Sequence, residues 1–134
     1  MVVDSSVLVA IVLREPGAET FLNALLDRDE TAYIGAVTAF EAALVLARRL
    51  GAPDLPILDG LMNEIEFEIV PFDGAQIAAA RAAYLRFGKG RHPARLNLGD
   101  CCAYALAKTL RQPLLCKGRD FALTDIARVD LRPA

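Results

Sequence analysis

The sequence predicts an α/β domain whose sheet is mainly parallel. Short apolar segments that suit buried strands alternate along the chain with longer segments of helical periodicity. The chain has 134 residues, of which 54% are hydrophobic and 24% are charged, values typical of one domain that spans residues 1–134. Because parallel strands are joined by helical crossovers, we expect helices on both faces of a sheet of four to five strands.

The strands are expected where brief apolar or β-branched runs end at turn-forming residues. Four such runs lie at residues 2–3, 31–34, 67–70 and 113–116, and residues 127–129 are a candidate for a fifth. Gly35 ends the second run. The small number of strands fits a compact single sheet.

Helices are expected between these strands. They should begin after Ser6 and at residues 16–17, and should cover residues 38–50, 53–62, about 74–87, and 99–110. In residues 38–50, one face carries Phe40, Ala43, Leu44 and Ala47. Asp73 and Gln76 have the spacing of a capping box. Residues 88–97, rich in Gly, Lys, Arg and Pro, are expected to form an exposed loop.

Cysteine content and hydropathy exclude several classes of protein. The three cysteines, Cys101, Cys102 and Cys116, show no CxxC spacing, which argues against a disulfide framework and a zinc site. The longest apolar run, residues 7–13, covers seven residues, whereas about 20 are needed to span a bilayer. No basic segment precedes that run, so we expect no secretory signal and a cytoplasmic protein.

Four carboxylates are expected at one edge of the sheet. Asp4 follows the first strand within an apolar segment, where a buried charge is costly unless it is paired or coordinates a cation. Glu41 lies early in the helix after the second strand, Asp100 begins the helix before the fourth strand, and Asp120 follows that strand. Sites in such folds form at the carboxyl ends of strands.

Each carboxylate also has a purely structural explanation. Thr38 and Glu41 match a capping box, and an acidic residue in a first turn, such as Asp100, gains roughly 0.3–1 kcal/mol from the helix dipole. Asp120 could cap a turn over residues 121–125, and Ser5 or Ser6 could bond to Asp4.

Taken together, the four carboxylates indicate a metal site. Two carboxylates ~4 Å apart repel by about 4 kcal/mol at an effective dielectric constant of 20, so a cluster needs a cation. An all-oxygen ligand set selects Mg²⁺ or Mn²⁺. Such ions activate water for phosphodiester hydrolysis.

Residues 74–99 contain no acidic residue but several basic ones, although the net charge of the chain is −2. The basic residues are Arg81, Arg86, Lys89, Arg91 and Arg95, with His92 among them. This segment is either a solvated surface or a contact for phosphates.

Over essentially its whole length the chain resembles the PIN-domain family, specifically the VapC toxins of toxin–antitoxin pairs. The resemblance rests on "VVDSSVLVAI", "AFEAALVL", "ARLNLGDCCAYALA" and "PLLCKGRDFALTDI". It implies a three-layer α/β/α fold and a Mg²⁺-dependent endoribonuclease that inhibits translation and growth. It further implies a homodimer and a tight complex with a cognate VapB-type antitoxin that blocks the active-site cleft.

The resemblance also implies roles for individual residues. The family's metal ligands match Asp4, Glu41 and Asp100, and Ser6 matches a hydroxyl position beside the first of them. Relatives often carry Asp or Asn where this chain has Arg119, so Asp120 is the acidic residue left for a fourth position. The cations expected to approach RNA are Arg86, Lys89, Arg91 and Arg95, with antitoxin or dimer contacts as the alternative.

Two other functions fit the sequence less well. A receiver-type phosphoacceptor domain needs a phosphorylatable Asp at the end of a central strand, and Asp54 instead follows a predicted helix. A catalytically silent PIN domain that only binds a partner would not need three acidic positions.

Overall fold

Four short parallel strands form the sheet in a computed structural model, which describes residues 1–51 and 55–131. The strands are β1 (Val2–Val3), β2 (Tyr33–Gly35), β3 (Glu68–Val70) and β4 (Leu114–Leu115). Their order across the sheet is β3-β2-β1-β4. Val2 is in register with both Tyr33 and Leu114, so β1 lies at the centre. The predicted parallel sheet is confirmed.

The candidate fifth strand at residues 127–129 forms a single bridge to β4. Leu114 N–H donates to the Ala127 carbonyl at 2.9 Å, and Val129 N–H donates to the Leu114 carbonyl at 2.9 Å. These two bonds pair Arg128 with Leu114 and lay the C-terminal segment beside β4.

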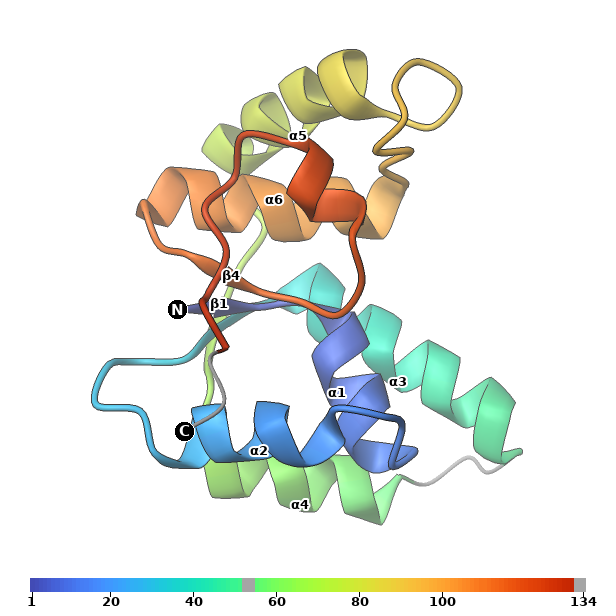
Figure 1. Cartoon of the computed structure of the whole chain (residues 1–134), viewed down its shortest axis with the longest axis vertical. Coiled ribbons are helices and arrows are strands. Elements are labelled where there is room, and N and C mark those ends of the chain that lie inside the picture. The colour runs from blue at the N-terminus through green and yellow to red at the C-terminus, as the bar shows by residue number, and fades with distance from the viewer. Residues whose placement is uncertain (52–54, 132–134) are drawn as a thin grey trace.

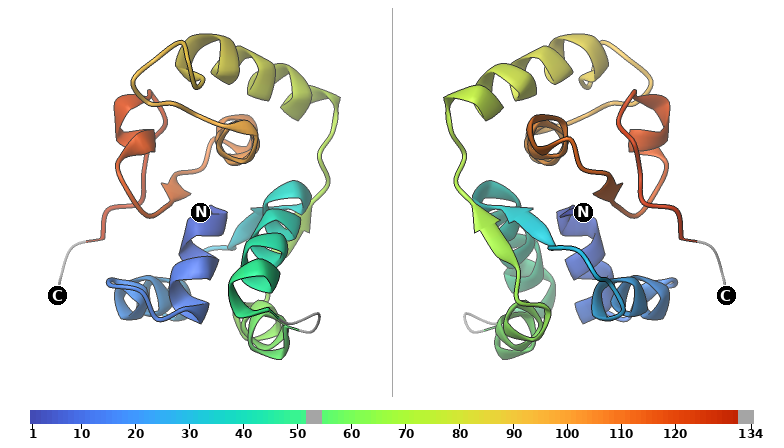
Figure 2. Two further views of the ribbon diagram at one scale, coloured as in Figure 1. Left: turned by 90° about the vertical axis from the view of Figure 1, so that its right-hand side faces the viewer. Right: turned by 90° about the vertical axis from the view of Figure 1, so that its left-hand side faces the viewer.

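Helices cover both faces of the sheet, which gives the three layers expected (Figures 1 and 2). One layer holds α5 (Gly74–Phe87) and α6 (Leu98–Leu110), with the 3₁₀ turn η1 (Asp120–Leu123) beside α6. The other holds α1 (Ser5–Val12), α2 (Ala18–Leu26), α3 (Ala36–Leu50) and α4 (Pro56–Ile65). Among the described helices, none combines the length and the apolarity that crossing a membrane requires.

Successive strand residues belong to opposite layers of the core. Val2 and Leu114 pack with the side chains of α5 and α6, whereas Val3 and Leu115 pack with those of α1 and α2. Since side chains alternate across a strand and helices cover both faces, every position of β1 and β4 is apolar and buried. This double burial explains why these two strands appear in the sequence as unbroken apolar runs.

Helix α3 differs from its prediction in start and in orientation. It begins at Ala36, directly after β2, so Glu41 lies in the second turn and Thr38 is buried inside the helix rather than capping it. The capping-box explanation of Glu41 is therefore wrong. The buried face carries Thr38, Ala42 and Leu46, while Phe40 and Leu44 are 64% and 43% exposed. The small Ala42 lets α3 pack closely against α1, a preference that apolar periodicity alone does not reveal.

Other helix boundaries follow their end signals. Gly51 adopts φ 63° after the last residue of α3, a left-handed conformation that suits glycine. Pro56 is the first residue of α4, and the predicted start at residue 53 lies outside the described residues. Asp73 accepts a bond from Gln76 N–H at 3.0 Å, while the Gln76 side chain donates to the Pro71 carbonyl at 2.7 Å. The cap of α5 is therefore made by Asp73 alone.

Candidate active site

Asp4 directly follows β1, at the carboxyl end of that strand. Strand β1 pairs with β2 on one side and with β4 on the other. Its backbone N–H donates to the Leu115 carbonyl at 2.9 Å, which holds it against the end of β4. Its side chain caps α1: Oδ2 accepts bonds from Ser6 N–H at 3.2 Å and from Ser6 Oγ at 2.6 Å. This is the strand-order switch point at which α/β sheets form their sites.

Ser6 links this carboxylate to the segment after β4. Its hydroxyl donates to Asp4 and accepts a bond from Lys117 N–H at 3.0 Å. Because the hydroxyl donates one hydrogen bond and accepts another, its orientation is fixed, and it holds Asp4 Oδ2 in one position.

The other oxygen of Asp4 has no hydrogen-bond partner among the described residues. Asp4 is 3% exposed, and Oδ1 accepts no hydrogen bond from any described residue. Burial raises the pKa of this carboxyl group, and the nearby charge of Glu41 raises it further, against the bonds from Ser6 that lower it. A buried, unpaired carboxylate oxygen is costly in the absence of a cation. This oxygen therefore fits a metal ligand.

Glu41 reaches the site from α3. Its Oε1 accepts a hydrogen bond from Ser5 Oγ at 2.7 Å. Its carboxylate also lies against the first turn of α6, where a Cβ added to Gly99 would overlap it. Ser5 and Gly99 thus enclose Glu41 from two sides.

Asp100 has a structural and an electrostatic role at once. It completes a capping box with Asn97: Asp100 Oδ2 accepts from Asn97 N–H at 3.0 Å, and Asn97 Oδ1 accepts from Asp100 N–H at 2.9 Å. Burial raises its pKa to about 6, with further contributions from the charges of Asp4, Glu41 and Asp120. The helix-end explanation is therefore correct, and the same carboxylate belongs to the acidic cluster.

Asp120 stands at the rim of this cluster. It is exposed at the start of η1, whose N-cap is Arg119 and has no side-chain capping bond, so the predicted capping role is not observed. It is close enough for its charge to contribute to the raised pKa of Asp100. Asp4, Glu41 and Asp100 are the inner members of the cluster and Asp120 is the outer one.

The three inner carboxylates share one arrangement. In each, one oxygen accepts hydrogen bonds from the protein, and within residues 1–51 and 55–131 the second oxygen accepts none. In the same part of the chain, no three Asp, Glu, His or Cys side chains are gathered tightly enough to hold one ion. The set supplies oxygen donors of the kind that Mg²⁺ and Mn²⁺ prefer.

The basic residues divide into two groups. Lys89, Arg91 and Arg95 are exposed on the loop between α5 and α6. Arg86, in the last turn of α5, instead pairs with Asp125 at 3.5 Å. His92 supports the loop, because its Nδ1 accepts a bond from the Ala94 N–H at 3.0 Å.

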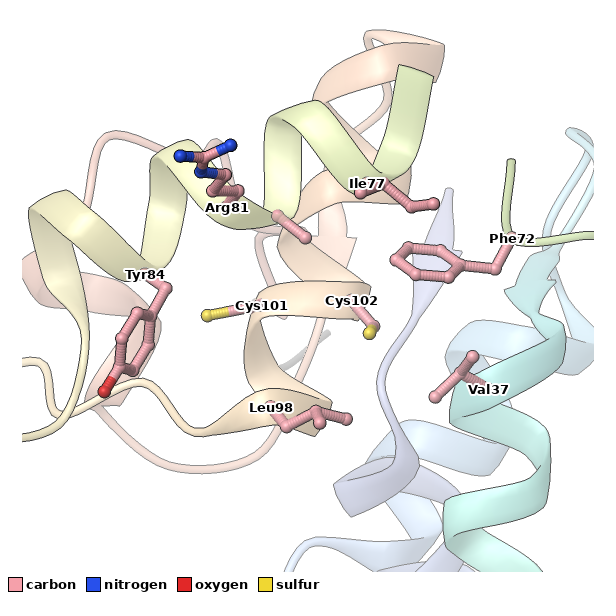
Figure 3. A pocket seen from close by; sticks show the side chains of 9 residues that line it. Val37, Phe72, Ile77, Arg81, Tyr84, Leu98, Cys101 and Cys102 are labelled. Atoms are coloured by element: carbon pink, nitrogen blue, oxygen red, sulfur yellow. The ribbon is translucent and has the colours of Figure 1, made fainter. Parts of the chain in front are cut away.

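An apolar groove of about 440 Å³ lies between α5, α6 and the start of α3 (Figure 3). The side chains in its wall come from α3, α5, α6 and the segment before α5: Val37, Phe72, Ile77, Tyr84, Leu98 and Cys102. Burial raises the pKa of the Cys102 thiol, and the charge of Glu41 contributes. Leu98 lines the groove and is 75% exposed. It directly precedes Gly99, which is in contact with the carboxylate of Glu41, so this end of the groove adjoins Glu41.

Comparison with known families decides the assignment. The family model described as "PIN domain" matches residues 1–127. The chain belongs to the PIN-domain family. This membership replaces the receiver-type hypothesis; Asp54, whose position in the sequence argued against that hypothesis, lies outside the described residues.

Curated relatives place this PIN domain in the VapC group. It is 46% identical to "Ribonuclease VapC" of Mycolicibacterium smegmatis, over 96% of this chain and 99% of the relative. It is also 46% identical to "Ribonuclease VapC30" of Mycobacterium tuberculosis, over 98% of this chain and 99% of the relative.

Solved structures show the same fold. The PIN domain superposes on the crystal structure of Mycobacterium tuberculosis VapC20, described as a sarcin–ricin-loop-cleaving toxin, with a TM-score of 0.78 and 14% identity over 98% of both chains. It superposes on a chain of a toxin–antitoxin complex from Klebsiella pneumoniae with a TM-score of 0.66 and 20% identity, over 90% of this chain and 89% of the other.

Two residues of the site escaped the sequence reasoning. The sequence predicts Ser5 only as a partner for Asp4, whereas in the structure it bonds to Glu41, 36 positions away. Gly99 is the first residue of the helix predicted over residues 99–110, where a glycine gives no signal of its own. The structure shows that the carboxylate of Glu41 lies against it.

Proposed function

We propose that this PIN domain is a divalent-metal-dependent endoribonuclease, the toxin of a VapBC-type pair, which inhibits translation and growth. The observation that carries the proposal is Asp4 Oδ1, a buried and unpaired oxygen beside two further carboxylates. The identity of 46% to proteins named ribonuclease VapC supports RNA as the substrate.

The residues present fit a hard divalent cation, Mg²⁺ or Mn²⁺. Asp4 and Asp100 are the proposed direct ligands, with Glu41 completing the pocket directly or through water. Such a cation, when bound, supplies positive charge to the scissile phosphate and lowers the pKa of a water molecule. We assign Asp120 to the outer rim as the fourth acidic residue.

The chain's own groups prepare this chemistry. Ser6 holds one oxygen of Asp4 at 2.6 Å, and the Asn97 backbone holds one oxygen of Asp100 at 3.0 Å. Each bond engages one oxygen of its carboxylate and leaves the second oxygen for the cation. Outer-shell groups commonly orient metal ligands in this way. The exposed cations Lys89, Arg91 and Arg95, together with Arg86, are proposed to attract the RNA backbone.

The partners proposed are a second copy of the chain and a cognate VapB-type antitoxin. Support comes from the apolar groove beside the cluster and from the exposed Phe40 and Leu44 on α3. A partner in this groove would cover the approach to Glu41 and so block the cleft. We place the activity in the cytoplasm, where thiols such as Cys102 stay reduced.

Asp4→Asn tests the proposal. Purified chains are incubated with RNA and added Mg²⁺ or Mn²⁺, and growth is followed on induced expression. We expect Asp4→Asn and Asp100→Asn to abolish cleavage and toxicity, and Asp59→Asn, on exposed α4, to retain both. Full cleavage by Asp4→Asn would overturn the metal assignment. No cleavage by the unsubstituted chain in either metal would instead indicate a silent binding module.

A further inference from the structure

We propose that Ser5 and Gly99 are positioning residues that hold Glu41 in the acidic site. They form a slot: Ser5 binds one carboxylate oxygen, and Gly99 leaves open the space in which the carboxylate lies. The inference deepens the proposed function, because it rests on Glu41 serving the metal.

The Ser5 side of the slot is a hydrogen bond between two elements. Ser5 begins α1, directly after Asp4, and its Oγ donates to Glu41 Oε1 at 2.7 Å. Ser6, the next residue, bonds to Asp4. Consecutive serines at one helix end therefore orient the carboxylates of two different elements.

The Gly99 side is steric. A Cβ at Gly99 would meet Glu41 Oε2, Cδ and Oε1, all atoms of the carboxylate. Gly99 is buried in the first turn of α6, and its backbone conformation is one that other residues adopt. A side chain at position 99 would therefore displace the carboxylate of Glu41, whereas the backbone there would accept it.

Glu41 lies among charged neighbours that would otherwise displace it. Its charge contributes to the raised pKa of both Asp4 and Asp100. Without the bond from Ser5, this repulsion would favour a rotation of Glu41 toward solvent. The slot therefore opposes a repulsion that is present whenever no cation is bound.

The experiment measures Mn²⁺ binding to the purified full-length chain by titration calorimetry and by the electron paramagnetic resonance signal of the free ion. We expect Ser5→Ala and Gly99→Ala to weaken Mn²⁺ binding about 10-fold, the range seen for outer-shell groups. Ser5→Thr, which keeps the hydroxyl, should restore binding. Gly60→Ala is the matched control, because no described atom lies within 4 Å of a Cβ at this glycine of α4.

A second measurement, the thermal midpoint of the metal-free chain, tests the contact between Gly99 and Glu41. Gly99→Ala should lower the thermal midpoint relative to Gly60→Ala, and this loss should vanish when Glu41→Ala is combined with it. Mn²⁺ binding by Gly99→Ala and Ser5→Ala equal to that of the unsubstituted chain would overturn the inference, as would a midpoint loss that persists without Glu41. If the unsubstituted chain binds no Mn²⁺, the proposed metal site fails, whereas the stability cycle still decides the contact between Gly99 and Glu41.

Discussion

The Ser6 hydroxyl lies 2.6 Å from Asp4 Oδ2 and is the main support of a carboxylate that is 3% exposed. The same hydroxyl accepts a bond from the backbone of Lys117. One side chain thus joins the end of β1, the start of α1 and the segment after β4.

Replacing Ser6 by Ala should shift the pH dependence of RNA cleavage. The hydroxyl bond from Ser6 lowers the pKa of Asp4, so its loss raises that pKa and moves the acid limb of the profile to higher pH, while the bond from the backbone N–H of residue 6 is kept. The unpaired N–H of Lys117 should also lower the free energy of unfolding by about 1–3 kcal/mol. Ser6→Thr should behave like the unsubstituted chain, and an unmoved acid limb in Ser6→Ala would contradict the role given to Ser6.

Stability without metal should fall as the pH rises through the acid range. Asp100 has a folded-state pKa of about 6 against a usual 3.8, so the folded chain binds the proton more tightly. Its contribution is complete below the usual pKa and is lost as the pH rises through the folded pKa. Urea unfolding between pH 4.5 and pH 7.5 measures the decline in the free energy of unfolding, which the linkage relation connects to the difference in bound protons between the folded and unfolded chains. Asp100→Asn should flatten the decline, and an equal slope in that variant would refute the assignment.

Asp4→Asn should leave the metal-free chain at pH 7.5 as stable as before or more stable. The substitution removes a buried charge that is repelled by Glu41, and the amide oxygen can still accept the bond from Ser6. The same variant should lose the stabilisation that Mn²⁺ gives to the unsubstituted chain. Thermal midpoints with and without Mn²⁺ test both statements, and a large midpoint loss without metal would contradict the first.

Tyr104→Phe should weaken the attachment of the segment after η1 to α6. Tyr104 donates its hydroxyl to Asp125 at 2.5 Å, and this bond is the main cause of the lowered pKa of Asp125. We expect a loss of about 1–2 kcal/mol in the free energy of unfolding by urea titration.

The stabilisation from the bond between Tyr104 and Asp125 should depend on pH in the opposite direction to that from Asp100. Because the pKa of Asp125 is lowered in the folded chain, this carboxylate stabilises the fold at pH values above its usual pKa. That contribution is lost as the pH falls through the folded-state pKa. Lys108→Ala is the control, because this exposed partner of Asp125 contributes less than about 1 kcal/mol. A larger loss in Lys108→Ala than in Tyr104→Phe would reverse the ranking proposed.

Leu98→Asp should weaken association without unfolding the chain. Leu98 is 75% exposed at the rim of the groove, and an acidic residue is favourable at the start of α6. Light scattering measures the proposed homodimer, and co-purification measures binding of the proposed VapB-type antitoxin. Leu123→Asp, on η1, is the control for an exposed leucine elsewhere. Unchanged association in Leu98→Asp would remove the groove from both interfaces.

The sequence by itself determined the α/β class, the four strands and the acidic residues that face one edge. These features are local, because apolar runs, capping residues and strand ends depend on neighbours a few positions apart. It also located Asp4, whose position in an apolar segment demanded a partner. The family resemblance added the chemistry that such a cluster performs.

Only the tertiary structure decided which side of α3 is buried and which oxygen of each carboxylate is held. Phe40 and Leu44 carry the apolar pattern of α3, yet packing against α1 selects the face with the small Ala42. Ser5 and Gly99 meet at Glu41 from positions 36 and 58 residues away along the chain. Contacts over such separations arise from the arrangement of whole elements, for which a single sequence carries no local signal.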